Sequence, residues 1–236
     1  DMVRARRIAA ALLLAAAALL GAPTTSAAQR PIEERRAAPA NGPIRIHQYG
    51  GSLSIVGSSS DSIVVTGTVH EIGGDRFYIS ATPQGSKLGI WPQQADTLPP
   101  SHLEIRVPRN SSVWIKTVSA DVLVNDVTGG VDVYSVSGQI DVTGSPRELF
   151  AETMAGDVRA DVATRSARLR TASGAITVRG RIADAAAQSV SGAVGVTSDD
   201  IERRMRALAV LRLVADPGHP QRPPSVMGMP PLGPSV

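Results

Sequence analysis

The chain has 236 residues, with 24 Lys or Arg, 21 Asp or Glu and no Cys. The absence of cysteine excludes disulfides and thiolate metal sites. It has only two Trp, three Tyr and two Phe, which look scattered along the sequence. Because basic patches with stacking aromatics are typical of nucleic-acid binding, this composition argues against a nucleic-acid partner.

Residues 1–28 have the pattern of a secretory signal peptide. Arg4, Arg6 and Arg7 precede an apolar run from Ile8 to Leu20, and small residues follow up to Ala28. The apolar run is short for a transmembrane span, so cleavage after Ala27 or Ala28 is expected, with an uncleaved anchor as the alternative. Cleavage would leave 21 basic and 20 acidic side chains, a net charge of +1, and no transmembrane segment.

Residues 29–41 are polar, contain proline and lack apolar periodicity, which predicts a linker. Short apolar alternations then predict an irregular N-terminal β portion, with strands at 44–46, 53–55, 63–69, 77–79, 88–90 and 103–107. Glycines and prolines interrupt residues 70–100, where we expect a hairpin that protects an end or an edge of the fold.

An eighteen-residue repeat without insertions organises residues 117–196. Its five copies begin at Thr117, Ser135, Thr153, Thr171 and Ser189. The sixth and eighth places of each copy are apolar, and a second apolar pair follows, as in Val131 and Val133. A lone copy buries too little to offset its ordering entropy, so the copies must stack. We therefore predict an all-β domain over residues 42–200, a single-stranded parallel β-solenoid (β-helix) with an 18-residue rung.

The fourth place of each copy holds only Ala120, Gly138, Gly156, Gly174 and Gly192. Either the chain bends there with a positive φ, or neighbouring backbone leaves no room for a side chain. Ala120 favours crowding, because alanine does not readily adopt a positive φ.

The repeat ends after Val196. Asp199 to Glu202 resembles a capping box, which predicts a short capping helix over 201–215 that closes the stack. Seven of the 21 residues from 216 to 236 are proline, so a disordered tail is expected there.

The first and third columns of the repeat predict two hydroxyl ladders that point outward, provided that the second and sixth columns point inward. The ladders comprise Thr117, Ser119, Ser135, Ser137, Thr153, Thr171, Ser173, Ser189 and Ser191. They are a candidate contact surface for a glycan, a cell-wall polymer or an envelope protein. The alternatives are that the hydroxyls satisfy backbone groups at a coil corner, or that they form a flat ice-binding face.

No motif for catalysis, cofactor binding or metal binding is recognisable. The four histidines have no ligand neighbour at metal spacing, and Asp121, Asp141 and Asp157 lack the glycine pattern of calcium-binding rolls. We therefore expect no enzyme activity, cofactor or metal. The alternative is a carbohydrate-active enzyme, which would require a groove with two carboxylates.

Leu103 to Pro108, followed by repeated Ser-Gly-x-Ile-x-Val segments such as Ser137 to Val142, resembles the bacterial putative-adhesin family of β-solenoid domains. The resemblance spans residues 44–196 and implies the β-solenoid fold. It also implies a non-enzymatic module for adhesion, envelope interaction or scaffolding. Such a module would be exported to the periplasm, the cell surface or the medium.

Export is testable directly. Mass spectrometry of the protein from its native host should give an N-terminus at Ala28 or Gln29. Soluble cytoplasmic protein that retains Arg4, Arg6 and Arg7 would contradict the prediction.

Overall fold

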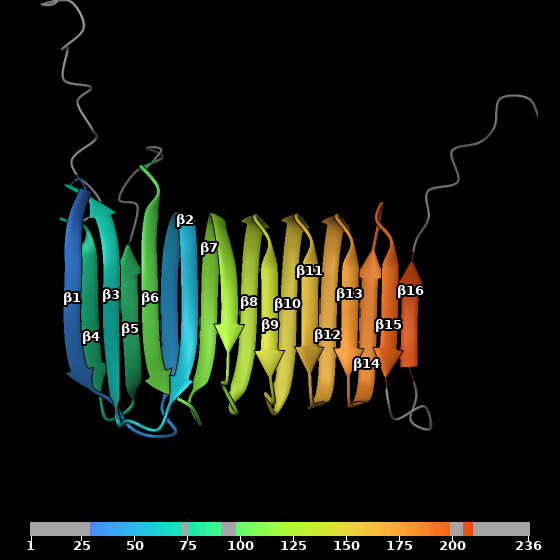
Figure 1. Ribbon diagram of the computed structural model, residues 1–236, viewed down its shortest axis with the longest axis horizontal. Coiled ribbons are helices and arrows are strands. Elements are labelled where there is room, and N and C mark those ends of the chain that lie inside the picture. The colour runs from blue at the N-terminus through green and yellow to red at the C-terminus, as the bar shows by residue number, and fades with distance from the viewer. Residues whose placement is uncertain (1–28, 72–74, 91–97, 199–204, 210–236) are drawn as a thin grey trace, which may run out of the picture.

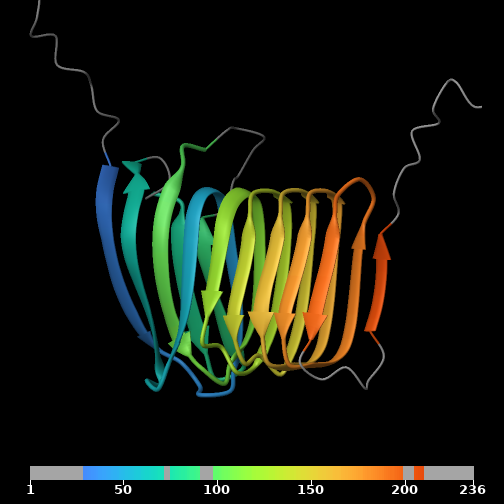
Figure 2. The same cartoon turned by 45° about the vertical axis from the view of Figure 1, so that its right-hand side comes forward.

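A computed structural model describes residues 29–71, 75–90, 98–198 and 205–209. The all-β prediction is confirmed: sixteen strands form one continuous sheet, folded into two facing walls with the core between them (Figures 1 and 2). In the described part of the chain, no helix has the length and apolar character needed to cross a membrane.

The two walls share two long strands, β2 (Pro43–Ser58) and β7 (Ser112–Asn125). Their first halves belong to the first wall, with β5 (Gly85–Ile90), β8 (Gly130–Ser137), β10 (Glu148–Ala155), β12 (Thr164–Ser173), β14 (Ile182–Ser189) and β16 (Met205–Ala209). Their second halves belong to the second wall, with β6 (Ser101–Pro108), β9 (Ile140–Gly144), β11 (Val158–Val162), β13 (Ile176–Gly180) and β15 (Val194–Ser198). The second wall runs in front of the first in Figures 1 and 2.

The repeated strands pair in parallel, with residues eighteen positions apart facing each other. Val158 of β11 lies opposite Ile140 and Ile176, and on the first wall Leu149 lies opposite Val131. The sixth column is interior as predicted: Val122, Ile140, Val158 and Ile176 are at most 2% exposed, and Val194 is partly buried. Each such burial contributes about 1.5–3 kcal/mol, and the two inward faces together form one core.

Strand direction reverses at the N-terminal end of the stack. On the second wall, β3 (Ser62–His70) is antiparallel to β6, and β1 (Gln29–Ala37) is antiparallel to β3. On the first wall, β4 (Phe77–Thr82) and β5 form an antiparallel hairpin, and β5 joins β2. The predicted hairpin within residues 70–100 is thereby confirmed at an edge of the sheet.

Two predictions at the ends are wrong. Residues 29–37 form β1 rather than a linker, because an edge strand needs only one backbone partner and tolerates Pro31. Residues 205–209 form β16, which is parallel to β14, rather than part of a capping helix. The open edge of β14 offers backbone hydrogen bonds that outweigh the marginal stability of a short helix. The rest of the predicted helix, the signal peptide and the Pro-rich tail lie outside the described residues.

At three of its five positions the glycine column satisfies both explanations at once, while Gly192 shows crowding without a positive φ. Gly138, Gly156 and Gly174 have φ values of +110°, +143° and +147°, and a Cβ on Gly156 would lie 2.1 Å from the carbonyl oxygen of Gly138. The preference for crowding alone is therefore wrong. Among the described non-glycine residues only Asp126 has a positive φ, so Ala120 fits because its backbone differs from that of Gly138, Gly156 and Gly174.

Gly156→Ala should lower the free energy of unfolding by at least about 1–3 kcal/mol, since the new methyl group meets both an unfavourable φ and a backbone oxygen. Gly195→Ala is the matched control, because nothing lies within 4 Å of its added Cβ. Urea denaturation of both variants measures the difference. Equal midpoints for Gly156→Ala and the wild type would contradict the geometry of this corner.

Candidate functional site

The first predicted hydroxyl ladder points into the protein, contrary to expectation. Its members Thr117, Ser135, Thr153, Thr171 and Ser189 are at most 8% exposed. The Thr117 hydroxyl donates to that of Ser135, and the other four donate to backbone carbonyls at the coil corner, as Ser135 does to Ser137 and Ser189 does to Gly174. A buried hydroxyl needs such a partner, so this column holds the corner together.

The third column lies at the surface. Ser119, Ser173 and Ser191 are exposed and Ser137 is half-buried. The hydroxyls of Ser137, Ser173 and Ser191 donate to carbonyl oxygens of the preceding copy. Between the ladders, the second column points outward rather than inward, with Val118, Val136, Met154 and Val190 exposed. Ligand contact by the third column stays a prediction.

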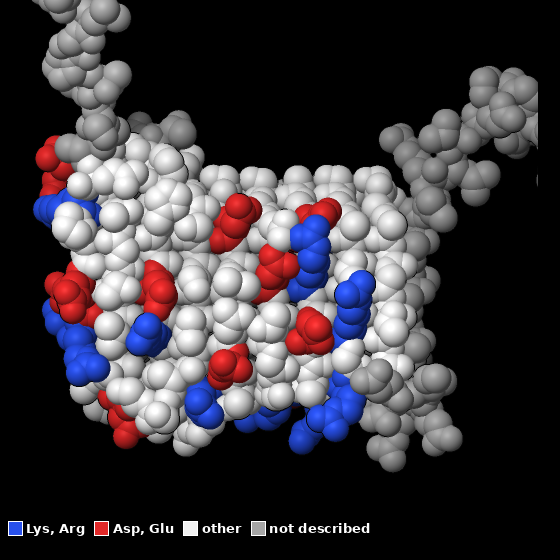
Figure 3. Space-filling view, in the orientation of Figure 1, with Lys and Arg blue, Asp and Glu red and all other residues white. Residues whose placement is uncertain are grey.

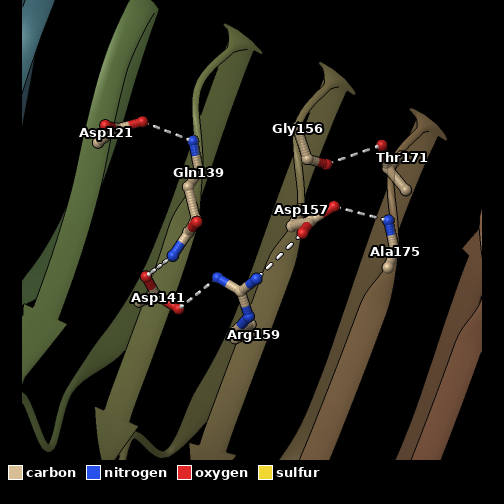
Figure 4. A network of polar contacts seen from close by, with 8 residues as sticks. All are labelled: Asp121, Gln139, Asp141, Gly156, Asp157, Arg159, Thr171 and Ala175. Carbon is tan, nitrogen blue, oxygen red and sulfur yellow. Dashed lines mark hydrogen bonds and ion pairs between the residues drawn. The ribbon is translucent and has the colours of Figure 1, made fainter.

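The carboxylates of the second wall bind neighbouring strands. Asp121 and Asp157 accept hydrogen bonds from the backbone amides of Gln139 and Ala175, at 2.8 and 2.9 Å (Figure 4). Arg159 pairs with Asp157 at 3.0 Å and with Asp141 at 3.9 Å. Acidic and basic side chains are interspersed over this face (Figure 3). Within the described ranges, no three potential metal ligands gather into a site.

A shallow depression on the same wall contains two carboxylates, those of Asp141 and Asp161. Arg159 and Arg179 line it as well, and Asp141 is already paired with Arg159. Asp141 is therefore held by an arginine rather than left open as the acid or base that glycoside hydrolysis uses.

A serine–histidine pair also lies on this wall. The hydroxyl of Ser52 is 2.8 Å from Nδ1 of His102. A catalytic triad would need a carboxylate on the other side of the histidine. Asp121 lies opposite Ser52 instead. It belongs to β7, which pairs with β2 on the side away from β6, the strand that carries His102. The pair is therefore a surface hydrogen bond between adjacent strands.

The outer face of the first wall carries a row of five rings, which we call the aromatic strip: Tyr78, His47, Trp114, Tyr134 and Phe150. They come from β4, β2, β7, β8 and β10. The ring centroids of His47 and Trp114 are 5.4 Å apart, those of Trp114 and Tyr134 5.7 Å, and those of Tyr134 and Phe150 5.2 Å. All five side chains are half-buried. Four of the seven Trp, Tyr and Phe residues are thus gathered, and for these four the view of the aromatics as scattered is wrong.

The strip zigzags across the strands. Trp114 and Phe150 both lie opposite Asp132, while Tyr134 is two residues further along β8. Trp114 and Tyr134 are therefore 20 residues apart and Tyr134 and Phe150 are 16 apart, one spacing longer and one shorter than the eighteen-residue repeat. That spacing is the signal in the sequence that could have revealed them. Each aromatic contact adds about 0.5–1.5 kcal/mol beyond the area it buries.

A glycine lies between the two rings at one end of the strip and leaves room for them to approach each other. Gly89 of β5 lies opposite both His47 and Tyr78, and has no side chain to separate them. The Tyr78 hydroxyl consequently approaches Nδ1 of His47 to 2.8 Å, a hydrogen bond. A Cβ on Gly89 would lie 1.9 Å from the carbonyl oxygen of His47, so the close approach requires glycine here.

The charges around the strip change along its length. Burial, together with Lys116, Arg45 and Lys87, lowers the pKa of His47. Burial raises the pKa of Tyr78. Further along, burial and the nearby Glu148 raise the pKa of Asp132. The histidine end is therefore electropositive, and carboxylates follow beyond Trp114.

Comparison with solved structures finds distant similarity. A putative adhesin from Bacteroides fragilis NCTC 9343 is 11% identical with a TM-score of 0.47, covering 78% of this chain and 96% of that chain. A putative cell adhesion protein from Clostridium sporogenes ATCC 15579 is 9% identical with a TM-score of 0.45, covering 72% and 100%. A putative lipid binding protein from Parabacteroides distasonis ATCC 8503 is 11% identical with a TM-score of 0.39, covering 77% and 95%.

No curated protein matches the chain. A family model does match, over residues 45–209, which include most of both walls. The resemblance read from the Ser-Gly repeats is thereby confirmed at the level of the family. The chain belongs to the Toastrack DUF4097 family.

Proposed function

We propose that this protein is an exported, non-enzymatic binding module of the cell envelope, whose aromatic strip holds an extended polysaccharide. Its scaffold is a single-stranded parallel β-solenoid with 18-residue rungs. The observation that carries the proposal is the gathering of five rings on one outer face of an otherwise aromatic-poor chain. Export rests on the pattern of residues 2–28.

Sugar rings match the chemistry of the strip. A pyranose has an apolar face of C–H groups, which packs on an aromatic ring, and a rim of hydroxyls that need polar partners. Trp114, Tyr134 and Phe150 supply half-exposed rings, and Asp132 lies between them as a hydrogen-bond acceptor. Neighbouring centroids are 5.2–5.7 Å apart, which is about the length of one sugar unit along an extended chain.

The shape of the face favours a polymer over a small molecule. The strip crosses parallel strands that are spaced about 4.8 Å apart, so successive sugars of a chain lying across them would meet successive strands. The backbone beneath is fixed by ladder hydrogen bonds, and little conformational entropy is lost on binding.

A binding role without catalysis is supported by the state of three acidic residues of the second wall. Asp121 and Asp157 accept backbone hydrogen bonds, and Asp141 pairs with Arg159. These carboxylates are occupied in holding strands together and cannot be assigned as the free acid and base of a hydrolase.

Binding of the purified protein to a glycan array and to cell-wall fractions tests the proposal. Trp114→Ala should weaken binding to the polymer that the wild type retains by about tenfold or more, because buried aromatic anchors dominate such interfaces. Titration calorimetry on that polymer would measure the change.

Leu123→Ala is the matched control. Leu123 is a large apolar residue of the same strand, 40% exposed on the opposite wall, and its loss should leave binding unchanged. Full binding by a folded Trp114→Ala, Tyr134→Ala double variant would refute the role of the strip. Capture by a wall fraction stripped of glycan would point to a protein partner and would also refute it.

A further inference from the structure

Three basic side chains meet at the Tyr78 end of the aromatic strip. Arg45 of β2 lies opposite Lys87 of β5, and Lys116 of β7 lies opposite His47. All three are exposed, and none forms an ion pair with another described residue. Like charges this close repel one another, so the group has an electrostatic preference for an anion. We call these three residues the basic trio.

The surface is hollowed at the same place. A depression of about 700 Å³ is lined by Arg45, Lys87, His47, Tyr78 and Trp114, with Asp132 at its far side. The charges of Arg45 and Lys87 and the first rings of the strip therefore face one space, and Lys116 lies beside it, opposite His47. Asp132 lies on the other side of Trp114 from Arg45, so its carboxylate does not come between the basic side chains.

We propose that the polymer held by the aromatic strip is anionic, and that one of its acidic groups binds among Arg45, Lys87 and Lys116 while the adjoining sugar stacks on Trp114. This inference rests on the proposed function and names the class of its ligand. The shared chemistry is an acidic group on a sugar chain, whether the carboxylate of a uronic acid or the phosphate of a phosphodiester-linked polymer.

The pKa of His47 depends on the charges in that site. The groups that face it are Arg45 on its own strand, Lys87 on β5, Lys116 on β7 and the Tyr78 hydroxyl on β4, with Asp132 beyond Trp114. In the free protein, burial and the basic trio keep its pKa below the value of 6.5 usual for histidine. The Tyr78 hydroxyl can accept as well as donate, so its hydrogen bond survives protonation of the ring.

A bound anion would reverse this electrostatic balance. Its negative charge favours the protonated imidazole, so the pKa of His47 should rise on binding. By reciprocity, affinity for the anion should increase as pH falls through the range between the free and bound pKa values of His47. Carboxyl groups of uronic acids stay ionised in that range, because carboxyl groups titrate at about pH 4.

The test compares three soluble polymers on the full chain. Polygalacturonate presents carboxylates, its fully methyl-esterified form presents the same backbone without charge, and a poly(glucosyl phosphate) presents phosphates between sugar rings. We expect polygalacturonate or poly(glucosyl phosphate) to bind at least about tenfold more tightly than the esterified polymer, with an affinity that falls as salt rises. The better of the two identifies the acidic group.

Arg45→Gln combined with Lys87→Gln should remove most of that preference and leave the weak binding of the esterified polymer unchanged. Arg165→Gln combined with Arg179→Gln is the charge-matched control, because both arginines are exposed elsewhere on the molecule. An equal loss in the control pair would show a non-specific charge effect and overturn the proposal.

NMR titration of His47 gives an independent readout. Its pKa should rise when the anionic polymer is saturating and should stay unchanged with the esterified polymer. Equal affinities for charged and esterified polymers, both weakened by Trp114→Ala, would overturn the anionic site and leave the proposed function standing. Polymer binding that is independent of Trp114 would instead overturn the proposed function and this inference with it.

Discussion

Close approach of backbone to backbone at one corner of each rung is the constraint on which the rest of the structure depends. Gly156 lies with its Cα against the carbonyl oxygen of Gly138, and Gly174 repeats the contact against Gly156. Hydrogen bonds continue the contact on both sides, from Val158 to Ala175 and from Ile140 to Asp157. A side chain at Gly138, Gly156 or Gly174, or an inserted residue at this corner, would separate adjacent rungs, and every ladder beyond it would lose its register.

The register acts differently on the two surfaces of each wall. Inside, each column must pack against its own copies, so the same few aliphatic residues recur. On the outer faces, the strand register sets only the spacing between side chains, and their identities are free to vary. A binding surface on such a scaffold is therefore built across strands, with one or two side chains from each. The aromatic strip has this form, and its rings stabilise the stack by the same contacts that align them.

The interior of the fold was predictable from sequence because it is periodic. The apolar columns through Val158 and Leu149 are visible as an eighteen-residue repeat, and both are buried. The corner was less predictable. Thr153 continues the inward alternation of Leu149 and Ala151, and the phase changes only between Thr153 and Val158, so counting back from Val158 does not give the direction of Thr153 or Met154. The candidate site was missed because its rings come from strands that are paired through space, with Tyr78 reaching His47 only through the hairpin. Strands β1 and β16 were missed because each forms where a neighbouring strand offers backbone partners, β3 for β1 and β14 for β16.

The reversal of strand direction beside the aromatic strip has an evolutionary consequence. Strands β3 and β4 run against their neighbours and stand outside the eighteen-residue register, so they fix one end of the stack. The strip occupies strands up to β10, next to this fixed end. Duplication or deletion of eighteen codons beyond β10 would lengthen or shorten the molecule by a whole rung and leave the strip unaltered. The length of the scaffold and the identity of its ligand can therefore diverge independently among descendants of this gene.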